Sequence, residues 1–134
     1  MSKMGYRSHV LLKTTTEGYL VCLKFNDTIE IEEHKPLACL VIKRTASGFY
    51  KFEQDYIKWY DSYPNVRNFN KMLDLLEQYD LPYKFIRIGE DYNDIETCSH
   101  EPEDTPEQIF ETSVEVNIYD PDDYDEDVTP LRKL

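Results

Sequence analysis

The apolar residues that follow Pro64 recur at spacings of three and four, and this pattern constrains the fold most. They are Val66, Phe69, Met72, Leu73, Leu76 and Tyr79. Such spacing places one apolar stripe along an amphipathic helix. Pro64 suits the first turn of a helix, whereas Pro82 disfavours helical backbone at Leu81. The sequence therefore predicts one helix of about four turns between these two prolines.

The segments on both sides of this helix alternate apolar and polar residues, which is typical of half-buried β-strands. They are His9–Thr14, Tyr19–Phe25, Phe49–Phe52, Tyr83–Ile88, Asp94–Thr97 and Thr112–Tyr119. A hairpin that joins the first two is predicted, with its turn at Thr14–Gly18. The continuous apolar run Leu37–Ile42 predicts a central strand covered on both faces. We expect an α+β fold in which an antiparallel sheet of about five or six strands carries one main amphipathic helix on one face.

The 134 residues fit one domain. We predict a single α+β domain over residues 1–119 and an acidic, flexible C-terminal tail over 120–134. No run of apolar residues is long enough to cross a membrane. The first residues lack the apolar core of a secretory signal, so we expect a cytoplasmic protein.

Acidic residues are concentrated in the last third of the chain. Sixteen acids lie between Gly89 and Asp127, without any Lys or Arg, in a chain of net charge −12. They are Glu90, Asp91, Asp94, Glu96, Glu101, Glu103, Asp104, Glu107, Glu111, Glu115, Asp120, Asp122, Asp123, Asp125, Glu126 and Asp127. Direct binding of a nucleic-acid backbone requires clustered Lys and Arg side chains, so the negative charge of this region argues against it.

Three interpretations of the acidic region stay open. One is a surface that steers a basic partner, including a protein that itself binds nucleic acid. Another is a solvated segment that keeps the protein soluble. The third is a Ca²⁺ site over Asp120–Asp125, although the Gly and the final Glu of an EF-hand loop are not at their places.

No cofactor, metal ion or catalytic residue is predicted. The three cysteines, Cys22, Cys39 and Cys98, match no zinc spacing and no disulfide framework. Cys98 and His100 form a weak metal or nucleophile signal, because neither a second ligand pair nor an orienting third group is identifiable. The sequence contains no Gly-rich motif that would cradle a phosphate.

Three motifs resemble those of a widespread family of small uncharacterised proteins from bacteriophages and prophages. They are MGYRS at residues 4–8, KWYDSYP at residues 58–64 and FIRIGEDYNDIE at residues 85–96. The resemblance covers residues 4–14 and 55–119. It implies an accessory viral protein that modulates host proteins or host defence in the cytoplasm of the infected bacterium. It also implies a helix after the first strand, where the alternation of Tyr19–Phe25 predicts a strand.

The charged and aromatic residues of these motifs form the predicted partner-binding site: Arg7, Tyr60, Arg87, Glu90, Asp91, Tyr92, Asp94 and Glu96. Trp59, by contrast, is expected in the core. We predict that the acidic surface binds a basic host protein and inhibits or redirects it in host takeover or counter-defence, with nucleic-acid mimicry as one route.

Three alternatives to this site remain. The charges could form only structural salt bridges, which stabilise little at a surface. A pocket beside Arg7 and Arg87 could bind a small molecule or nucleotide, with or without hydrolysis. Exposed edge strands could pair two copies of the chain into a homo-oligomer.

Overall fold

Six strands form one antiparallel sheet in the part of the chain that the structure describes, in the order β5-β4-β1-β3-β2-β8. The structure is a computed structural model and describes residues 5–91, 93–110, 113–114, 118–119 and 126–127. Its strands are β1 Ser8–Thr14, β2 Val41–Arg44, β3 Tyr50–Ile57, β4 Tyr83–Gly89, β5 Ile95–His100, β6 Ser113–Val114, β7 Ile118–Tyr119 and β8 Glu126–Asp127. Its helices are α1 Thr16–Thr28, the 3₁₀ turn η1 Glu32–His34, α2 Pro64–Gln78 and α3 Glu107–Phe110.

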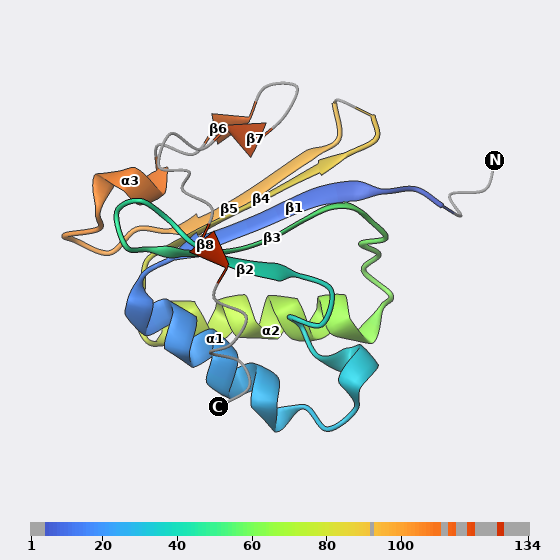
Figure 1. The fold of residues 1–134 in the computed structure, drawn as a ribbon, viewed down its shortest axis with the longest axis horizontal. Helices are drawn as coiled ribbons and strands as arrows, with labels where there is room; N and C mark the ends of the chain where they lie inside the picture. The colour runs from blue at the N-terminus through green and yellow to red at the C-terminus, as the bar shows by residue number, and fades with distance from the viewer. Residues whose placement is uncertain (1–4, 92, 111–112, 115–117, 120–125, 128–134) are drawn as a thin grey trace.

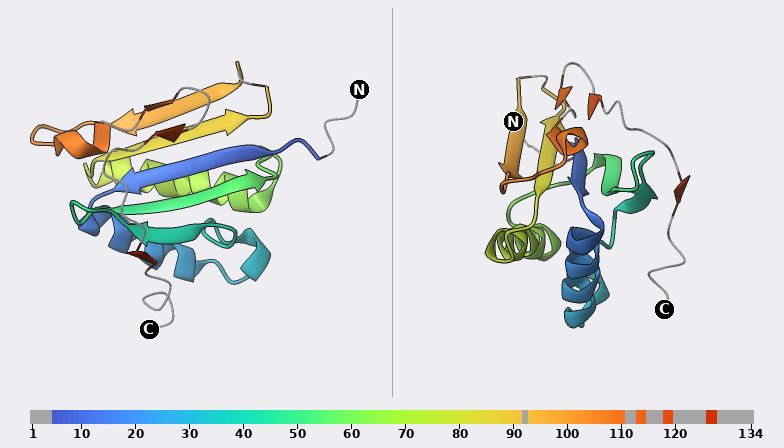
Figure 2. Two further views of the ribbon diagram at one scale, coloured as in Figure 1. Left: turned by 45° about the horizontal axis from the view of Figure 1, so that its top comes forward. Right: turned by 90° about the vertical axis from the view of Figure 1, so that its left-hand side faces the viewer.

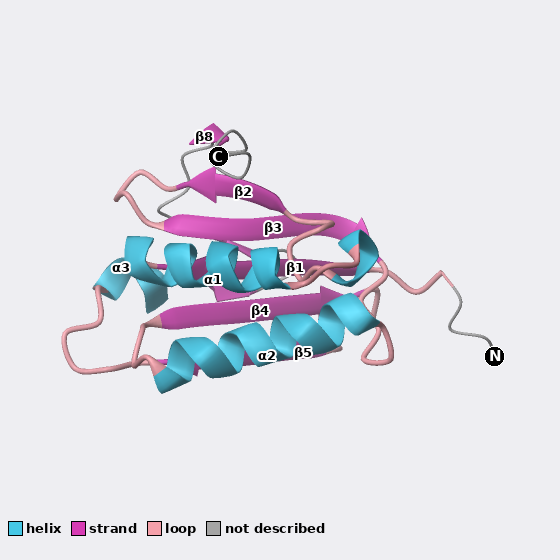
Figure 3. Cartoon of the chain, turned by 90° about the horizontal axis from the view of Figure 1, so that it is seen from below, coloured by secondary structure: helices cyan, strands magenta, loops and turns pink. Residues whose placement is uncertain are grey.

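The order of elements defines a known topology. The chain runs β1-α1-β2-β3-α2-β4, and these strands lie side by side as β4-β1-β3-β2. This is the split βαβ arrangement of ferredoxin-like folds, extended here by β5 beyond β4. Helices α1 and α2 cover the same face of the sheet (Figures 1 and 3), whereas α3, β6 and β7 lie on the opposite side (Figure 2). The predicted α+β class is confirmed.

Strand β1 occupies the middle of the core. Leu12 is fully buried and lies opposite Phe52 of β3 and Phe85 of β4. Trp59 packs edge-on against Phe69 of α2, with ring centroids 4.9 Å apart. Its side chain is only 8% exposed, which confirms that it belongs to the core.

The strand predicted at Tyr19–Phe25 is wrong, because these residues belong to α1. The hairpin predicted across Thr14–Gly18 is wrong for the same reason. Thr15 caps the helix, and its hydroxyl accepts a hydrogen bond from the backbone of Gly18 at 3.2 Å. Tyr19, Cys22 and Asn26 are buried at helical spacing. The sheet face therefore carries two helices where the sequence predicted one.

Two other predicted strands differ from the structure. Leu37 and Leu40 pack into the core from a turn, and only Val41–Arg44 forms a strand, near the edge of the sheet. The single strand predicted over Thr112–Tyr119 is wrong as well, since Ser113–Val114 and Ile118–Tyr119 pair with each other. The other predicted strands and α2 are found, although β3 continues to Ile57 and β5 to His100, beyond the predicted ends at Phe52 and Thr97.

Most of the predicted tail, residues 120–125 and 128–134, lies outside the described residues. The two residues of β8 pair with Lys43 and Arg44 of β2. No helix in the described part of the chain is long and apolar enough to span a membrane.

Gly18 provides a test of the contact between α1 and β1. A Cβ atom at this position would collide with Oγ1 of Thr14, which is held by a 2.8 Å hydrogen bond to the carbonyl of Pro82. Gly18→Ala should therefore destabilise the protein by about 1–3 kcal/mol. At an unconstrained helical site the same change stabilises by about 0.5–1 kcal/mol.

Urea unfolding at equilibrium measures this difference. Lys24→Ala, an exposed change on the same helix, serves as the control and should stay within about 0.5 kcal/mol of the parent protein. A Gly18→Ala variant more stable than the parent would contradict the packing described here.

Candidate functional site

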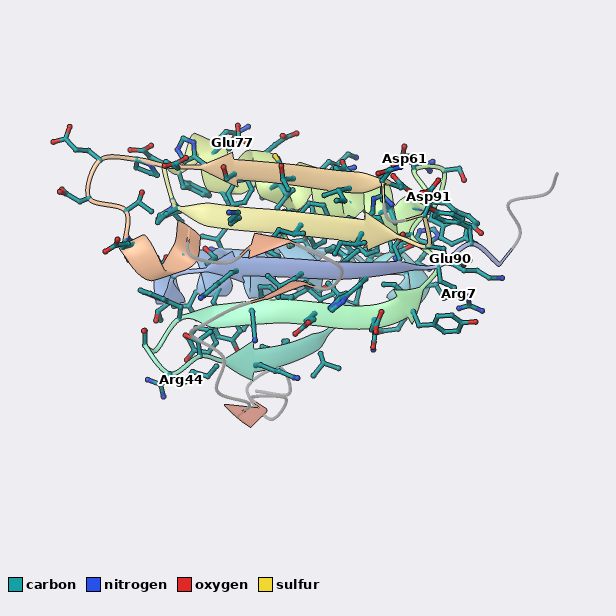
Figure 4. The ribbon with its side chains drawn as sticks, turned by 90° about the horizontal axis from the view of Figure 1, so that it is seen from above. Arg7, Arg44, Asp61, Glu77, Glu90 and Asp91 are labelled. Atoms are coloured by element: carbon teal, nitrogen blue, oxygen red, sulfur yellow. The ribbon has the colours of Figure 1, made fainter. Side chains whose placement is uncertain are left out.

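Most of the predicted partner-binding residues lie at one end of the sheet, where β4 ends and β5 begins. Figure 4 shows Arg7, Glu90 and Asp91 there, with Asp61 beside them. Tyr92 lies outside the described residues. The β4–β5 hairpin brings the acidic motif back over Arg87, and β1 delivers the N-terminal residues to the same place.

Arg87 is held by two carboxylates. Its Nη2 lies 2.8 Å from Oδ1 of Asp94, its Nη1 lies 3.2 Å from Oδ2 of Asp94, and its Nε lies 3.0 Å from Oε1 of Glu96. The Nη1 atom also donates to the hydroxyl of Ser8 at 3.2 Å. The hydrogen bonds with Asp94, followed by those with Glu96, raise the pKa of Arg87 despite its burial. The guanidinium is therefore engaged on all three nitrogens within the protein.

Tyr6 ties the N-terminal segment to this network. Its hydroxyl donates to Oδ2 of Asp94 at 2.7 Å and accepts from the backbone N–H of Asp91 at 3.2 Å. The Asp91 N–H lowers the pKa of Tyr6, but the Asp94 carboxylate and burial raise it more, so the pKa lies above 10.0. Gly89 leaves room for this contact, because a Cβ there would displace the hydroxyl of Tyr6 and the carboxylate of Asp94.

A pocket of about 300 Å³ opens beside Arg87. Three aromatic side chains, three carboxylates and one guanidinium line it: Tyr6, Trp59, Tyr60, Asp61, Asp94, Glu96 and Arg87. We call this set the acidic–aromatic pocket. Arg87 pairs across the sheet with Val10, a core residue on the helix side, so the pocket opens on the helix side of the sheet. Tyr60 packs near Tyr63, with centroids 4.9 Å apart.

Arg7 lines two other hollows, one of about 140 Å³ and one of about 470 Å³. Its guanidinium lies 4.9 Å from the ring centre of Tyr56, and its backbone N–H donates to Oε2 of Glu90 at 2.6 Å. The Nε atom is buried and has no hydrogen-bond partner among the described residues. Tyr56 has a left-handed φ of 58°, which strains a non-glycine residue. Among the described residues Arg7 and Arg87 line different pockets, so this part of the structure does not assemble the small-molecule pocket that both arginines were predicted to form.

Cys98 and His100 do not meet as a reactive pair in the described residues. The thiol of Cys98 lies 3.2 Å from the hydroxyl of Tyr83, which donates to Glu77 at 2.6 Å. The Nε2 atom of His100 lies 2.9 Å from Oδ1 of Asp80. Among these residues no group of three or more His, Cys, Asp and Glu side chains could hold a metal ion.

The opposite face of the sheet carries a row of lysines. Lys43, Lys51, Lys13 and Lys84 lie directly opposite one another on β2, β3, β1 and β4. We call them the lysine row. Lys13 is 0% and Lys51 2% exposed. Like charges in direct cross-strand register repel, and Glu53, whose Oε1 lies 4.0 Å from Lys51, reduces this repulsion. The basic lysine row and the acidic–aromatic pocket thus lie on opposite faces of one sheet.

Three pocket residues were not among the predicted binding residues: Tyr6, Trp59 and Asp61. Each lies within a motif that carries the phage-family resemblance, MGYRS or KWYDSYP. Those motifs were therefore the feature of the sequence from which these three pocket residues could have been predicted. A scan against protein-family models and searches of curated proteins and solved structures gave no match.

Arg87→Lys tests whether the hydrogen bonds of all three guanidinium nitrogens stabilise the protein. A lysine keeps the charge but cannot bridge Asp94, Glu96 and Ser8 together. The variant should lose about 2 kcal/mol in urea unfolding, and Arg87→Met should lose more, because the carboxylates would then face each other uncompensated. A lysine variant as stable as the parent would show that the several hydrogen bonds of the Arg87 guanidinium contribute nothing to stability beyond its charge.

Glu53→Gln tests the counter-charge of the lysine row. Burial raises the pKa of Glu53, but the hydrogen bond with His9 and the charge of Lys51 lower it more, to below 4.5. An acid with a depressed folded-state pKa stabilises the protein above its ordinary pKa, and this effect is lost as the pH falls through the folded-state value. The variant should therefore be less stable than the parent at neutral pH, and the gap should close below pH 4.5.

Chemical unfolding at a series of pH values measures that gap. Glu103→Gln, which changes an exposed acid, is the control and should leave the pH profile of the parent unchanged. A gap for Glu53→Gln that stays constant with pH would contradict the proposed origin of the shift.

Proposed function

We propose that this chain is a binding protein whose acidic–aromatic pocket receives a cationic group from the surface of a basic partner. The composition of the pocket is the observation that carries the proposal. Its three carboxylates and one guanidinium leave two negative charges in excess. Aromatic rings attract cations through their quadrupoles, so the aromatic lining of the pocket and its negative charge both favour a cationic ligand.

The state of Arg87 supports a cation over an anion. All three of its nitrogens already contact Asp94, Glu96 or Ser8, so an anionic ligand would have to displace a carboxylate. Asp61 adds a further carboxylate on the pocket wall. A guanidinium or ammonium from a partner would instead meet the outer oxygens of these acids.

The aromatic residues supply contact area for such a complex. Tyr, Trp and Arg dominate the binding energy of protein interfaces. Tyr60 lines the pocket with Trp59 and packs near Tyr63, and Tyr56 is exposed in its stack with Arg7. A basic side chain held in the pocket would therefore be surrounded by aromatic surface that excludes water.

The resemblance to phage and prophage proteins suggests the setting. In this proposal the protein acts in the cytoplasm of an infected bacterium and binds a basic surface of a host protein, which it inhibits or redirects. If that host protein binds nucleic acid, occupation of its basic groove would exclude the nucleic acid. Such competition would serve host takeover or counter-defence.

Neutralising the pocket should weaken binding. The Asp61→Asn/Glu96→Gln double variant is expected to bind a fluorescent octa-arginine peptide at least ~10-fold more weakly in an anisotropy titration, because two attractive charges are removed. For the parent protein the association rate should fall by ~10-fold or more as salt is raised, since steering by charge is screened.

The matched control is Asp27→Asn/Glu30→Gln, which removes the same charge from exposed positions at the end of α1. Equal loss of affinity in both double variants would show that net charge alone matters and would exclude the pocket as the site. Binding that does not respond to salt would exclude a charged partner.

A further inference from the structure

The outer edge of β5 is unpaired among the described strands, and its exposed residues run beside the acidic–aromatic pocket. We propose that β5 accepts an extended basic segment of the partner as an additional antiparallel strand. This inference rests on the proposed function, which it deepens by naming the form of the ligand. The segment gains affinity from main-chain hydrogen bonds and specificity from alternate side chains.

The hydrogen-bond pattern of the β4–β5 hairpin shows which groups face outward. The N–H of Gly89 donates to the carbonyl of Asp94 at 2.8 Å, at the start of the ladder. Hydrogen-bonded pairs alternate along an antiparallel ladder, so Glu96, Cys98 and His100 are bonded to β4. The N–H and C=O groups of Ile95, Thr97 and Ser99 therefore point away from β4, toward the open edge.

Strand β5 carries no proline, lysine or bulge, three of the devices that block strand addition at an open edge. Its register with β4 runs from Ile95 to His100 without a shift. Ile95 is 44% exposed. The edge is thus regular and able to template another strand.

Acids on the helix side of the edge specify a basic segment. Figure 4 shows Asp61 and Glu77 near opposite ends of β5. Asp61 shares the pocket with Glu96 at the start of the strand, and Asp80 contacts His100 at its end. These two acidic positions are four residues apart along β5, about 13 Å. Because alternate residues share a face, basic residues at positions i and i+4 of the added strand would reach both.

The same acids disfavour a second copy as the occupant. Antiparallel pairing of two β5 strands would bring Asp61, Glu77 and Asp80 of both copies to one seam. Like charges brought together at an interface repel and suppress the wrong partner. A basic segment of another protein meets this edge with complementary charge.

Thr97→Pro tests the strand addition separately from the pocket. Proline removes the outward N–H and adds a ring on the open side, yet it leaves every bond to β4 and every acid in place. The probe is a nine-residue peptide with lysine at its third and seventh positions and valine or threonine elsewhere. Its affinity for Thr97→Pro should fall at least ~10-fold, whereas Thr97→Val should bind within ~2-fold of the parent.

A second peptide, with lysines at the third and sixth positions, has the same charge but places them on opposite faces. It should bind at least ~5-fold more weakly, because only one lysine reaches the helix side. Urea unfolding of the free Thr97→Pro variant checks that the sheet is intact. Sedimentation should find the free protein monomeric, and a dimer abolished by Thr97→Pro would overturn the assignment of the edge to a partner.

The two proposals fail differently. If Thr97→Pro binds the peptide as the parent does while Asp61→Asn/Glu96→Gln does not, strand addition is wrong and the cation pocket stands. If the acidic double variant also keeps full affinity, the proposed function itself is wrong.

Discussion

The double coverage of β1 is the constraint on which the rest of the structure depends. This strand pairs with β3 on one side and β4 on the other, and six of its seven residues are buried. A strand so enclosed fixes the register of both neighbours, because a shift by one residue would move every apolar side chain to the wrong face. The same register sets Tyr6, just before β1, against Asp94 beyond β4.

The spacing of apolar residues was enough to predict an element wherever it follows a single period, either that of a helix or that of a strand. The helical stripe of α2 and the alternation of β1, β3 and β4 leave no competing reading. In α1 the residues Tyr19, Val21, Leu23 and Phe25 alternate as in a strand, but Leu20 and Cys22 between them are apolar too. The segment therefore satisfies a strand and a helix equally. The deciding features were the Thr15 cap and Gly18, which packs against Thr14 and so lets α1 start directly after β1. Such a contact becomes visible only when the two elements are placed together.

The candidate site was predictable to the extent that its residues are neighbours in the chain. Arg87, Asp94 and Glu96 come together because a short hairpin joins β4 to β5. Trp59 and Asp61 reach the same pocket from the segment before α2, and Tyr6 arrives from the N-terminus. Charge and composition do not predict such contacts between residues that are far apart in the sequence. The motifs contained all three residues, yet only the fold shows that they share a cavity.

The arrangement also changes what the acidic region can do. Part of the charge that the sequence concentrates after Gly89 is engaged by Arg87, so it does not act only as a diffuse negative surface. What remains is local: a pocket with two excess negative charges and aromatic walls, and a strand edge flanked by acids. The lysine row lies on the other face of the same sheet, where Lys13 and Lys51 are buried. In the proposed complex, a cationic group would therefore be drawn to the pocket and to the strand edge beside it, and not to a charge spread over the whole acidic region.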